Sequence, residues 1–179
     1  MSDDERSLAQ RAIKGDSAAF ALLYDRYVDK IYRYIFYKVG TSAEAEDLTA
    51  QVFLKAWESI GSYHWTERPF AAWLYRIAHN LVVDHFRTHH VTAPIDDRSL
   101  EDDAVVEDIV QQQLTNEMLR KTIARLTDEQ QQVIILRFLE GYSTSEVARL
   151  IDKDEGAVRA LQHRALDALQ RMLRKEAKP

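Results

Sequence analysis

The apolar residues of this chain recur at intervals of three and four, the spacing that aligns them along one face of an α-helix. The longest such run extends from Ala18 to Val39, and Gly40 is expected to end it. Its apolar stripe consists of Phe20, Leu23, Tyr27, Ile31, Tyr34 and Ile35. A shorter helix is expected over Leu8 to Lys14, with Gly15 directly after it.

Two further amphipathic segments complete the first half of the chain. The first begins at Thr41, three residues before Glu44, which is the spacing of a capping box, and Gly61 ends it. Its apolar face consists of Leu48, Val52, Phe53, Ala56, Trp57 and Ile60. The second is expected to begin at Pro69, because proline fits the first turn of a helix, and to run to about Thr88. Its expected buried residues are Phe70, Trp73, Leu74, Ile77, Leu81 and Phe86.

The second half shows the same helical spacing, and no segment of the sequence has a strong strand pattern. A helix is expected over residues 109–126, with contacts made by Leu114, Met118, Leu119 and Ile123. Thr127 and Gln130 have the spacing of another capping box, and Gly141 is expected to end the helix that they open. That helix carries three apolar residues, Val133, Ile134 and Phe138.

Residues 143–173 are the most informative segment, because they predict two helices joined by a tight turn. Ser143 and Glu146 open the first helix with a capping-box spacing, and the second begins near Glu155. The apolar stripe of the second helix consists of Val158, Leu161, Ala165, Leu169 and Leu173. Asp152 stands where the turn usually has glycine, and aspartate tolerates the left-handed conformation better than most residues. A helix-turn-helix places an exposed helix in the major groove of DNA, whereas the alternative is an ordinary helical hairpin.

The segment between the two halves differs from both in composition. Residues 91–108 have no sustained period, contain Pro94 and are rich in acids, which is typical of a flexible linker. We therefore predict an all-α fold of two small helical domains, residues 1–90 and 109–179, joined by a flexible acidic linker. The second domain contains the helix-turn-helix.

Composition narrows the classes of function. The 179 residues include no cysteine, which excludes disulfides, cysteine zinc sites and thiol redox chemistry within the chain. The acidic N-terminus has no apolar run, and no stretch approaches the ~18 apolar residues of a membrane span, so a cytoplasmic protein is expected. The net charge is −5, but residues 95–108 alone hold seven acids and one arginine. Residues 156–179 hold six lysines or arginines against two acids, which suits a nucleic-acid partner.

Two helices and one loop carry side chains suited to nucleic acid. On the last helix, arginines suit phosphates, while glutamine and histidine suit base edges, and the candidates are Arg159, Gln162, His163, Arg164 and Arg171. The outer face of the helix from Phe70 carries Arg76, His79, Asn80, Asp84 and Arg87. The preceding loop holds three rings that can stack on unpaired bases, those of Tyr63, His64 and Trp65. A solvated helix face, and a Trp65 folded into the core, are the alternatives.

One more face is polar without being basic. Opposite the apolar stripe of residues 44–60 lie Glu44, Asp47, Gln51, Lys55 and Glu58. Mixed charges of this kind indicate either simple solvation or a docking face for a partner helix.

Three segments together resemble the extracytoplasmic-function sigma factors of bacteria, the smallest class of the sigma-70 family. They are AEDLTAQVFLKAW, FAAWLYRIAHNLVVDHFR and LTDEQQQVIILRFLEGYSTSEVARLI. These segments occur in the family's order, with a linker between the two domains as the family has. The resemblance implies that residues 9–88 are sigma region two and residues 112–175 are region four. It implies as partners core RNA polymerase, promoter DNA and an anti-sigma factor, and it implies no cofactor.

The resemblance also implies a role for each candidate surface. The helix over residues 44–57 would dock on the clamp of the polymerase. The helix over residues 70–87 and the loop 61–68 would read and hold open the minus-ten element. The helix over residues 155–171 would enter the major groove at the minus-thirty-five element. The chain departs from the family at Ala160-Leu161 and at Leu166, where relatives often carry serine or arginine, so its promoter sequence is not to be inferred from relatives.

Two other classes of function are alternatives to a sigma factor: an enzyme or metal protein, and a stand-alone regulator. An enzyme or metal protein finds support in His85 and His89, which are four residues apart, but no third ligand has a clear spacing. No glycine-rich phosphate loop or nucleophile motif is present, so no catalytic residue is assigned. A stand-alone helix-turn-helix regulator with a helical N-terminal sensing domain is the alternative within DNA binding, and it would share the second domain.

Overall fold

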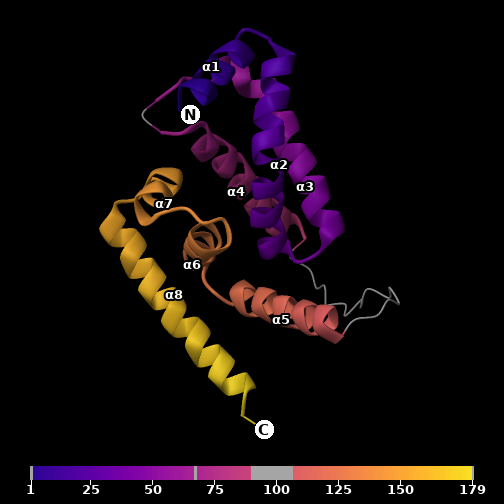
Figure 1. Cartoon of the computed structure of the whole chain (residues 1–179), viewed down its shortest axis with the longest axis vertical. Helices are drawn as coiled ribbons and strands as arrows, with labels where there is room; N and C mark the ends of the chain where they lie inside the picture. Colours follow the sequence, from indigo (N-terminus) through magenta and orange to yellow (C-terminus); the bar gives the residue numbers. More distant parts are fainter. Residues whose placement is uncertain (1, 67, 90–106, 179) are drawn as a thin grey trace.

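The computed structural model describes residues 2–66, 68–89 and 107–178, and every regular element within these ranges is helical (Figure 1). The first helical unit consists of α1 (Ser2–Ile13), α2 (Ser17–Val39), α3 (Ser42–Ser59) and α4 (Phe70–Thr88). The second consists of α5 (Glu107–Ala124), α6 (Asp128–Ile134), α7 (Thr144–Ile151) and α8 (Glu155–Glu176). The predicted all-α fold is confirmed. Most of the predicted linker lies outside the described residues.

The helix ends follow from the caps that the sequence provides. Thr127 with Gln130, and Ser143 with Glu146, form complete capping boxes at the starts of α6 and α7. In each box the hydroxyl accepts from a backbone N–H while the longer side chain accepts from the cap's own N–H. Asp152 ends α7 in the left-handed conformation, with φ of 56° and ψ of 49°, as predicted for the turn.

The helix α2 is the centre of the first unit and packs against α1, α3 and α4 (Figure 1). Its residues Leu23, Ile31, Tyr34 and Ile35 are almost completely buried. Burial of one such large side chain contributes about 1.5–3 kcal/mol relative to exposure. In the second unit, α8 packs against α5, α6 and α7. The first helix starts earlier than predicted, at Ser2 rather than Leu8.

Several residues predicted to be buried are exposed. Phe86 and Leu173 lie near the ends of α4 and α8, and Met118 on α5 is likewise exposed. Phe138 lies within a π-helical turn over Ile135–Leu139, whose wider spacing rotates its side chain away from the core. Ile135 and Leu136 fill the core there instead, and the Arg137 guanidinium lies over the exposed Phe138 ring. Pro69 is the N-cap of α4 rather than its first helical residue.

The two units pack on each other. Helix α7 contacts α4, while α2 contacts α5 and the π-helical turn. Figure 1 likewise draws α7 beside α4. This packing brings residues of the second unit to the edge of the α4 face that carries the predicted minus-ten residues.

Candidate nucleic-acid interface

The outer face of α8 has two flanks, which differ in whether their cationic side chains contact a carboxylate of the same helix. Successive residues of an α-helix are about 100° apart, so the buried Leu161, Ala165 and Leu169 define its inner face. By the same rotation, Arg159 and His163 lie on one flank of the outer face, and Arg164 and Arg171 lie on the other. The five predicted minus-thirty-five residues therefore do not form a single line.

Contacts with carboxylates of the same helix occupy the first flank. The Arg159 guanidinium contacts the Glu155 carboxylate at 2.9 Å, and His163 Nε2 lies 3.4 Å from Asp167 Oδ2. Among the described residues, Arg164 and Arg171 make no ion pair. The second flank thus offers cations that are already available to phosphate.

Gln162 is half-buried at the edge of the inner face of α8. Its Oε1 is enclosed and has no hydrogen-bond partner within the described part of the chain. A base contact from Gln162 therefore needs a rotation of its amide out of this position, whereas His163 is already exposed.

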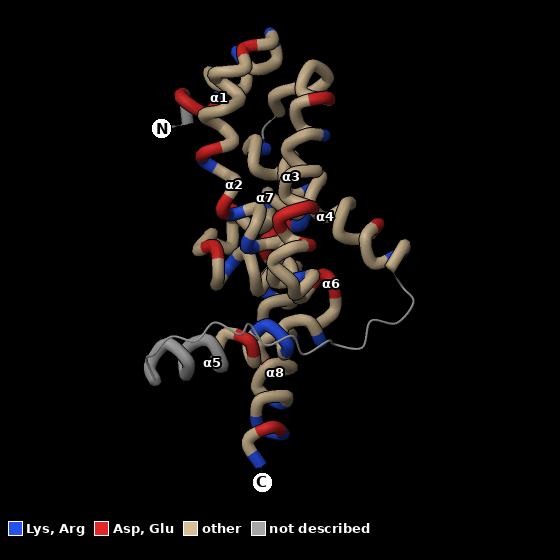
Figure 2. The backbone as a smooth tube through the Cα atoms, turned by 90° about the vertical axis from the view of Figure 1, so that its right-hand side faces the viewer, with Lys and Arg blue, Asp and Glu red and all other residues tan. Residues whose placement is uncertain are grey.

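A shallow pocket of about 220 Å³ extends the cationic flank. Two basic residues that line it, Arg125 and Lys175, are not among the residues predicted from the sequence. Arg171 lines it together with Arg125, at the end of α5, and Lys175. Arg125 is 45 positions or more from these residues, so only the packing of α5 on α8 brings it there. Figure 2 shows the basic residues that continue along α8 toward the C-terminus.

The outer face of α4 is exposed as predicted over most of its length. Arg76, Asn80, Asp84 and Arg87 are exposed, and Arg87 lies 3.8 Å from the Asp84 carboxylate. His79 differs from them, because it is half-buried and faces the second unit. The structure therefore separates His79 from the other residues of this face.

The aromatic loop before α4 does not present three free rings. Tyr63 is only 8% exposed and packs against Phe70 and Trp73, with ring centroids 5.4 and 4.9 Å apart. The prediction of an exposed Tyr63 ring is wrong, because the short helical turn Ile60–Ser62 directs the ring into the core. Burial, with a smaller effect of Glu5, raises the pKa of Tyr63 to about 12.

Trp65 and His64 are the rings of this loop that solvent reaches. Trp65 is half-buried against Tyr63, and the Arg6 guanidinium lies 6.0 Å from the centre of its ring. His64 is exposed. Of the three rings predicted to stack on bases, these two retain an accessible surface in this structure.

The polar face of α3 contains a leucine that the sequence pattern did not reveal. Asp47, Gln51, Lys55 and Glu58 are exposed, and Leu54 lies among them with 58% of its surface exposed. Its position off the buried stripe of α3 is the signal that could have identified it. An exposed leucine within a ring of charges is typical of the centre of a docking face.

Glu44 belongs less to this face than predicted. Its carboxylate accepts from the Thr41 hydroxyl at 2.8 Å and lies 3.4 Å from His85 Nε2 on α4. These contacts tie the start of α3 to α4, so Glu44 has a structural role as well.

The histidines at the end of α4 stack on each other. The rings of His85 and His89 are 4.3 Å apart, and His89 Nδ1 is 2.8 Å from the backbone carbonyl of His85. Within the described ranges, no group of three or more histidines and carboxylates is arranged to hold a metal ion. None of the described helices is long and apolar enough to cross a membrane.

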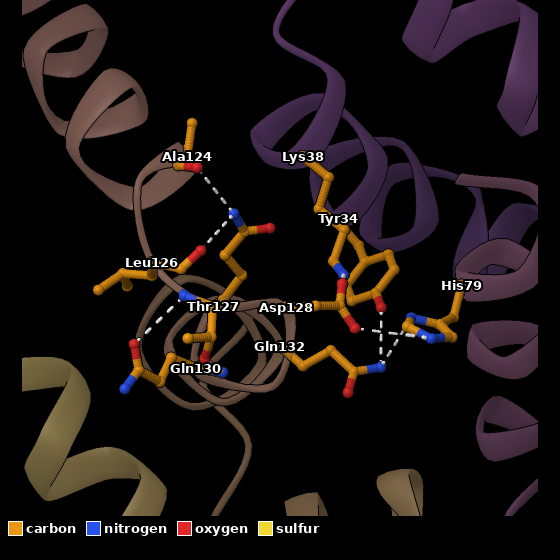
Figure 3. Close-up of polar contacts among 10 residues, drawn as sticks. Tyr34, Lys38, His79, Ala124, Leu126, Thr127, Asp128, Gln130 and Gln132 are labelled. Carbon is orange, nitrogen blue, oxygen red and sulfur yellow. Dashed lines mark hydrogen bonds and ion pairs between the residues drawn. The ribbon is translucent and has the colours of Figure 1, made fainter. Parts of the chain in front are cut away.

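Polar side chains from both units meet beside the α4 face (Figure 3). Lys38 donates to Asp128 Oδ1 at 2.6 Å, and the amide of Gln132 contacts Tyr34 Oη at 3.1 Å and His79 Nδ1 at 3.2 Å. Burial and the neighbouring Lys38 lower the pKa of His79, and together they outweigh Asp128. His79 is therefore neutral at pH 7, and its 3.6 Å approach to Asp128 is not an ion pair there.

A cleft of about 1250 Å³ adjoins this cluster. One wall includes His64, Arg76 and His79, and the other includes Asp128 and the end of α7, residues 148–153. Four of the eight predicted minus-ten residues, Tyr63, His64, Arg76 and His79, therefore line this cleft.

The all-α fold, the helix-turn-helix and two basic helices in separate units define a helix-turn-helix DNA-binding protein. Residues 23–91 match the family model of sigma-70 region 2, and residues 116–169 match that of sigma-70 region 4. SigW of Bacillus subtilis, an ECF RNA polymerase sigma factor, is 33% identical over 174 residues, covering 90% of this chain and 92% of SigW. The chain belongs to the ECF (extracytoplasmic-function) sigma factors of the sigma-70 family.

A second relative is more similar but longer. BldN of Streptomyces coelicolor, also an ECF RNA polymerase sigma factor, is 43% identical over 175 residues. The match covers 96% of this chain and 66% of BldN, so the chain spans just under two thirds of that relative's length.

Two solved structures share the fold. The structure of CnrH in complex with the cytosolic domain of CnrY matches with a TM-score of 0.73 at 23% identity, covering 97% of this chain and 99% of CnrH. RpoE of Bartonella quintana, solved with the anti-sigma factor NepR, matches with a TM-score of 0.63 at 19% identity, covering 87% of this chain and 96% of RpoE. At these identities the likeness concerns the fold alone.

Proposed function

We propose that this chain is an alternative sigma factor that binds core RNA polymerase and directs promoter-specific transcription initiation. Its partners in this proposal are core polymerase, promoter DNA and an anti-sigma factor, and it acts in the cytoplasm. It catalyses no covalent step, because its contribution is to position and hold DNA.

One observation carries the proposal: two basic helices, α4 and α8, belong to different helical units of one chain. Each offers only a few cations, so each alone binds DNA weakly. When polymerase holds both units at a fixed separation, the second contact becomes intramolecular and the two affinities combine. This arrangement supports a reader of two separated promoter elements.

Each surface has an assigned role in the proposal. The exposed face of α3, with Leu54 among its charges, docks on core polymerase. The α4 face from Arg76 to Arg87 and the ring of Trp65 read and hold open the minus-ten element. Helix α8 contacts the minus-thirty-five element, with Arg164 and Arg171 on phosphates and His163 on a base edge.

Separating the DNA strands at the minus-ten element costs free energy, and contacts made by the first unit must offset that cost. Extruding one base from the stack costs a few kcal/mol, and stacking on an aromatic ring returns about 1–3 kcal/mol per base. A single ring such as Trp65 therefore needs help from phosphate contacts by Arg76 and Arg87.

The test is run-off transcription with purified core polymerase on a library of randomised promoters. The proposal predicts transcripts only when the chain is added, and selection of two sequence elements at a fixed separation. Transcription that does not depend on the chain would refute it. Co-purification with core polymerase separates this function from a stand-alone regulator, which needs no such complex.

A further inference from the structure

Helix α1 contacts both the loop and the helix that are proposed to read the minus-ten element. Three buried residues, Leu8, Ala9 and Ala12, hold α1 in the core of the first unit. Its first turns carry Glu5 and Arg6, which precede the predicted start of this helix at Leu8. Both also precede residue 23, where the match to sigma-70 region 2 begins. Neither the sequence pattern nor the family match therefore assigns them a role.

The start of α4 has no capping side chain of its own. Its N-cap residue is Pro69, which makes no side-chain hydrogen bond to the helix. The backbone N–H of Phe70 instead donates to Glu5 Oε1 at 3.1 Å, across 65 positions of the chain. A carboxylate at this place satisfies one of the free N–H groups of the helix and interacts favourably with the helix dipole. Glu5 thus caps α4 from another helix.

The Glu5 carboxylate is itself held in place by α2. The Tyr27 hydroxyl donates to Glu5 Oε2 at 2.9 Å, and the Arg26 guanidinium lies 3.8 Å from the same oxygen. Only 17% of the Glu5 side chain is exposed. Because this carboxylate has partners on both α2 and α4, it ties the first residue of α4 to the rest of the first unit.

The next residue of α1 contacts the ring that is proposed to capture a base. The Arg6 guanidinium lies 6.0 Å from the centre of the Trp65 ring, at the outer limit of a cation–π contact. Tyr63 meets the same ring edge-on, with ring centroids 6.5 Å apart. Arg6 is exposed and Trp65 is half-buried, so the ring keeps an accessible surface while both neighbours restrict its orientation.

We propose that α1 is a positioning element of the minus-ten reader, in which Glu5 fixes the start of α4 and Arg6 orients the Trp65 ring for an unpaired base. Ordering the ring and the helix start before DNA binds raises affinity, because less conformational freedom is lost on binding. The effect on DNA rests on the function proposed for α4 and Trp65, whereas the cap is testable in the free chain without DNA.

The cap is measured by amide hydrogen exchange at the start of α4 in the free chain. Glu5→Ala should speed exchange of the Phe70 amide about tenfold, because its N–H loses a hydrogen-bond acceptor. Glu5→Gln keeps an acceptor oxygen and should retain most of the protection. The matched control is Asp4→Ala, since Asp4 lies on the same helix but pairs with Arg26 of α2 at 2.8 Å. Equal Phe70 protection in Glu5→Ala and in this control would overturn the cap.

The effect on DNA is measured with the chain assembled on core polymerase. The probe is a single-stranded oligonucleotide that carries the minus-ten sequence selected from the promoter library. Arg6→Ala should weaken its binding about threefold, the size of an exposed cation–π contact, and Glu5→Ala should weaken it by at least as much. Affinity for core polymerase should stay unchanged in both variants, because neither residue belongs to the α3 docking face. A loss of core affinity by the same factor would show a merely structural role and overturn the proposal.

A double-mutant cycle shows whether Arg6 acts through the ring. In a Trp65→Ala background, Arg6→Ala should have no further effect on oligonucleotide binding. A full further effect would mean that Arg6 contacts DNA directly and would overturn its positioning role. Arg6→Lys keeps a cation beside the ring and should retain most of the affinity.

The matched control for the Arg6 variants is Arg11→Ala on the same helix, because Arg11 pairs with Asp16 at 2.7 Å, away from the ring. Arg6 is exposed, so its variants test the proposal even if Glu5→Ala fails to fold. Oligonucleotide binding by Arg6→Ala equal to that of Arg11→Ala would overturn the proposal. Failure of the proposed function is a distinct result, since it would appear as a wild-type complex that selects no minus-ten sequence at all.

Discussion

Individual residues of this protein act through the charge of their side chain, through their backbone conformation, or through both. His79 is neutral because it is enclosed beside Lys38, and Asp152 both occupies a left-handed turn and pairs with Arg68. Both lie at the boundary between the two units. Substitutions there can therefore separate the contribution of charge from that of local conformation.

The lowered pKa of His79 predicts a pH dependence with a definite sign. The folded state favours neutral His79, so its contribution is present above the ordinary pKa of 6.5 and is lost as pH falls toward the lowered value. His79→Gln removes this titration and leaves Lys38, Asp128 and Gln132 in place. Urea unfolding between pH 5 and pH 8 should show the wild type losing stability relative to the variant below about pH 6.5. A constant difference would contradict the assignment.

The turn at Asp152 predicts different effects for two substitutions that both remove its carboxylate. Its φ of 56° is unfavourable for alanine and accessible to glycine. Asp152→Gly should therefore be more stable than Asp152→Ala by about 1 kcal/mol in urea unfolding. Equal stabilities would mean that the turn relaxes out of the left-handed region.

Helices α3, α4 and α8 each bury one face and leave the other for a partner. The capping boxes that open α6 and α7, and the left-handed glycine that ends α2, were readable from the sequence because they are local and depend on residues three or four apart. The buried Tyr63, the outward Phe138 and the docking-face Leu54 were not. Their directions depend on the turn at residue 60, on the π-helical turn and on neighbouring helices, which local spacing does not encode.

Arg164 and Arg171, which make no ion pair within the part of the chain that the structure describes, predict a change in salt dependence. Each phosphate contact contributes about 0.9 to the slope of log affinity against log salt, so Arg164→Ala and Arg171→Ala should each lower the slope of promoter binding by about that amount. Leu166→Ala changes an exposed, uncharged residue on the other flank of α8, so it is the control and should leave the slope unchanged. The measurement is promoter binding by the assembled polymerase complex across a range of salt concentrations. Unaltered slopes for both arginine variants would place them away from DNA.

The exposed leucine on α3 predicts a specific loss of docking. Leu54→Glu should weaken binding to core polymerase at least tenfold, about 1.4 kcal/mol, because it places a charge at the centre of the face. Since the side chain is largely exposed, the unfolding free energy should change by less than about 0.5 kcal/mol. Leu22→Glu, at an exposed leucine of α2, is the matched control. Equal loss in both variants would indicate a general surface effect.

At the scale of the whole molecule, two small helical units pack through ion pairs, and each carries one of the two helices proposed to contact DNA. The order and spacing of the sequence motifs predicted the all-α fold and the family, while the roles of the candidate site residues stay predictions. The packing between them was not predictable, because Lys38–Asp128 and Arg33–Glu140 join residues 90 and 107 positions apart. No local pattern relates such positions, and it is likewise the packing of α5 on α8 that brings Arg125 to the cationic flank of α8.

Run-off transcription from a randomised promoter library, with wild type, Arg76→Ala and Arg164→Ala compared on core polymerase, tests the central claim most directly. The account predicts that the wild type selects two elements. It predicts that Arg164→Ala loses selection at the upstream element alone, and that Arg76→Ala loses it at the downstream element alone. Selection of both elements unchanged in both variants, or transcripts that form without the chain, would contradict it.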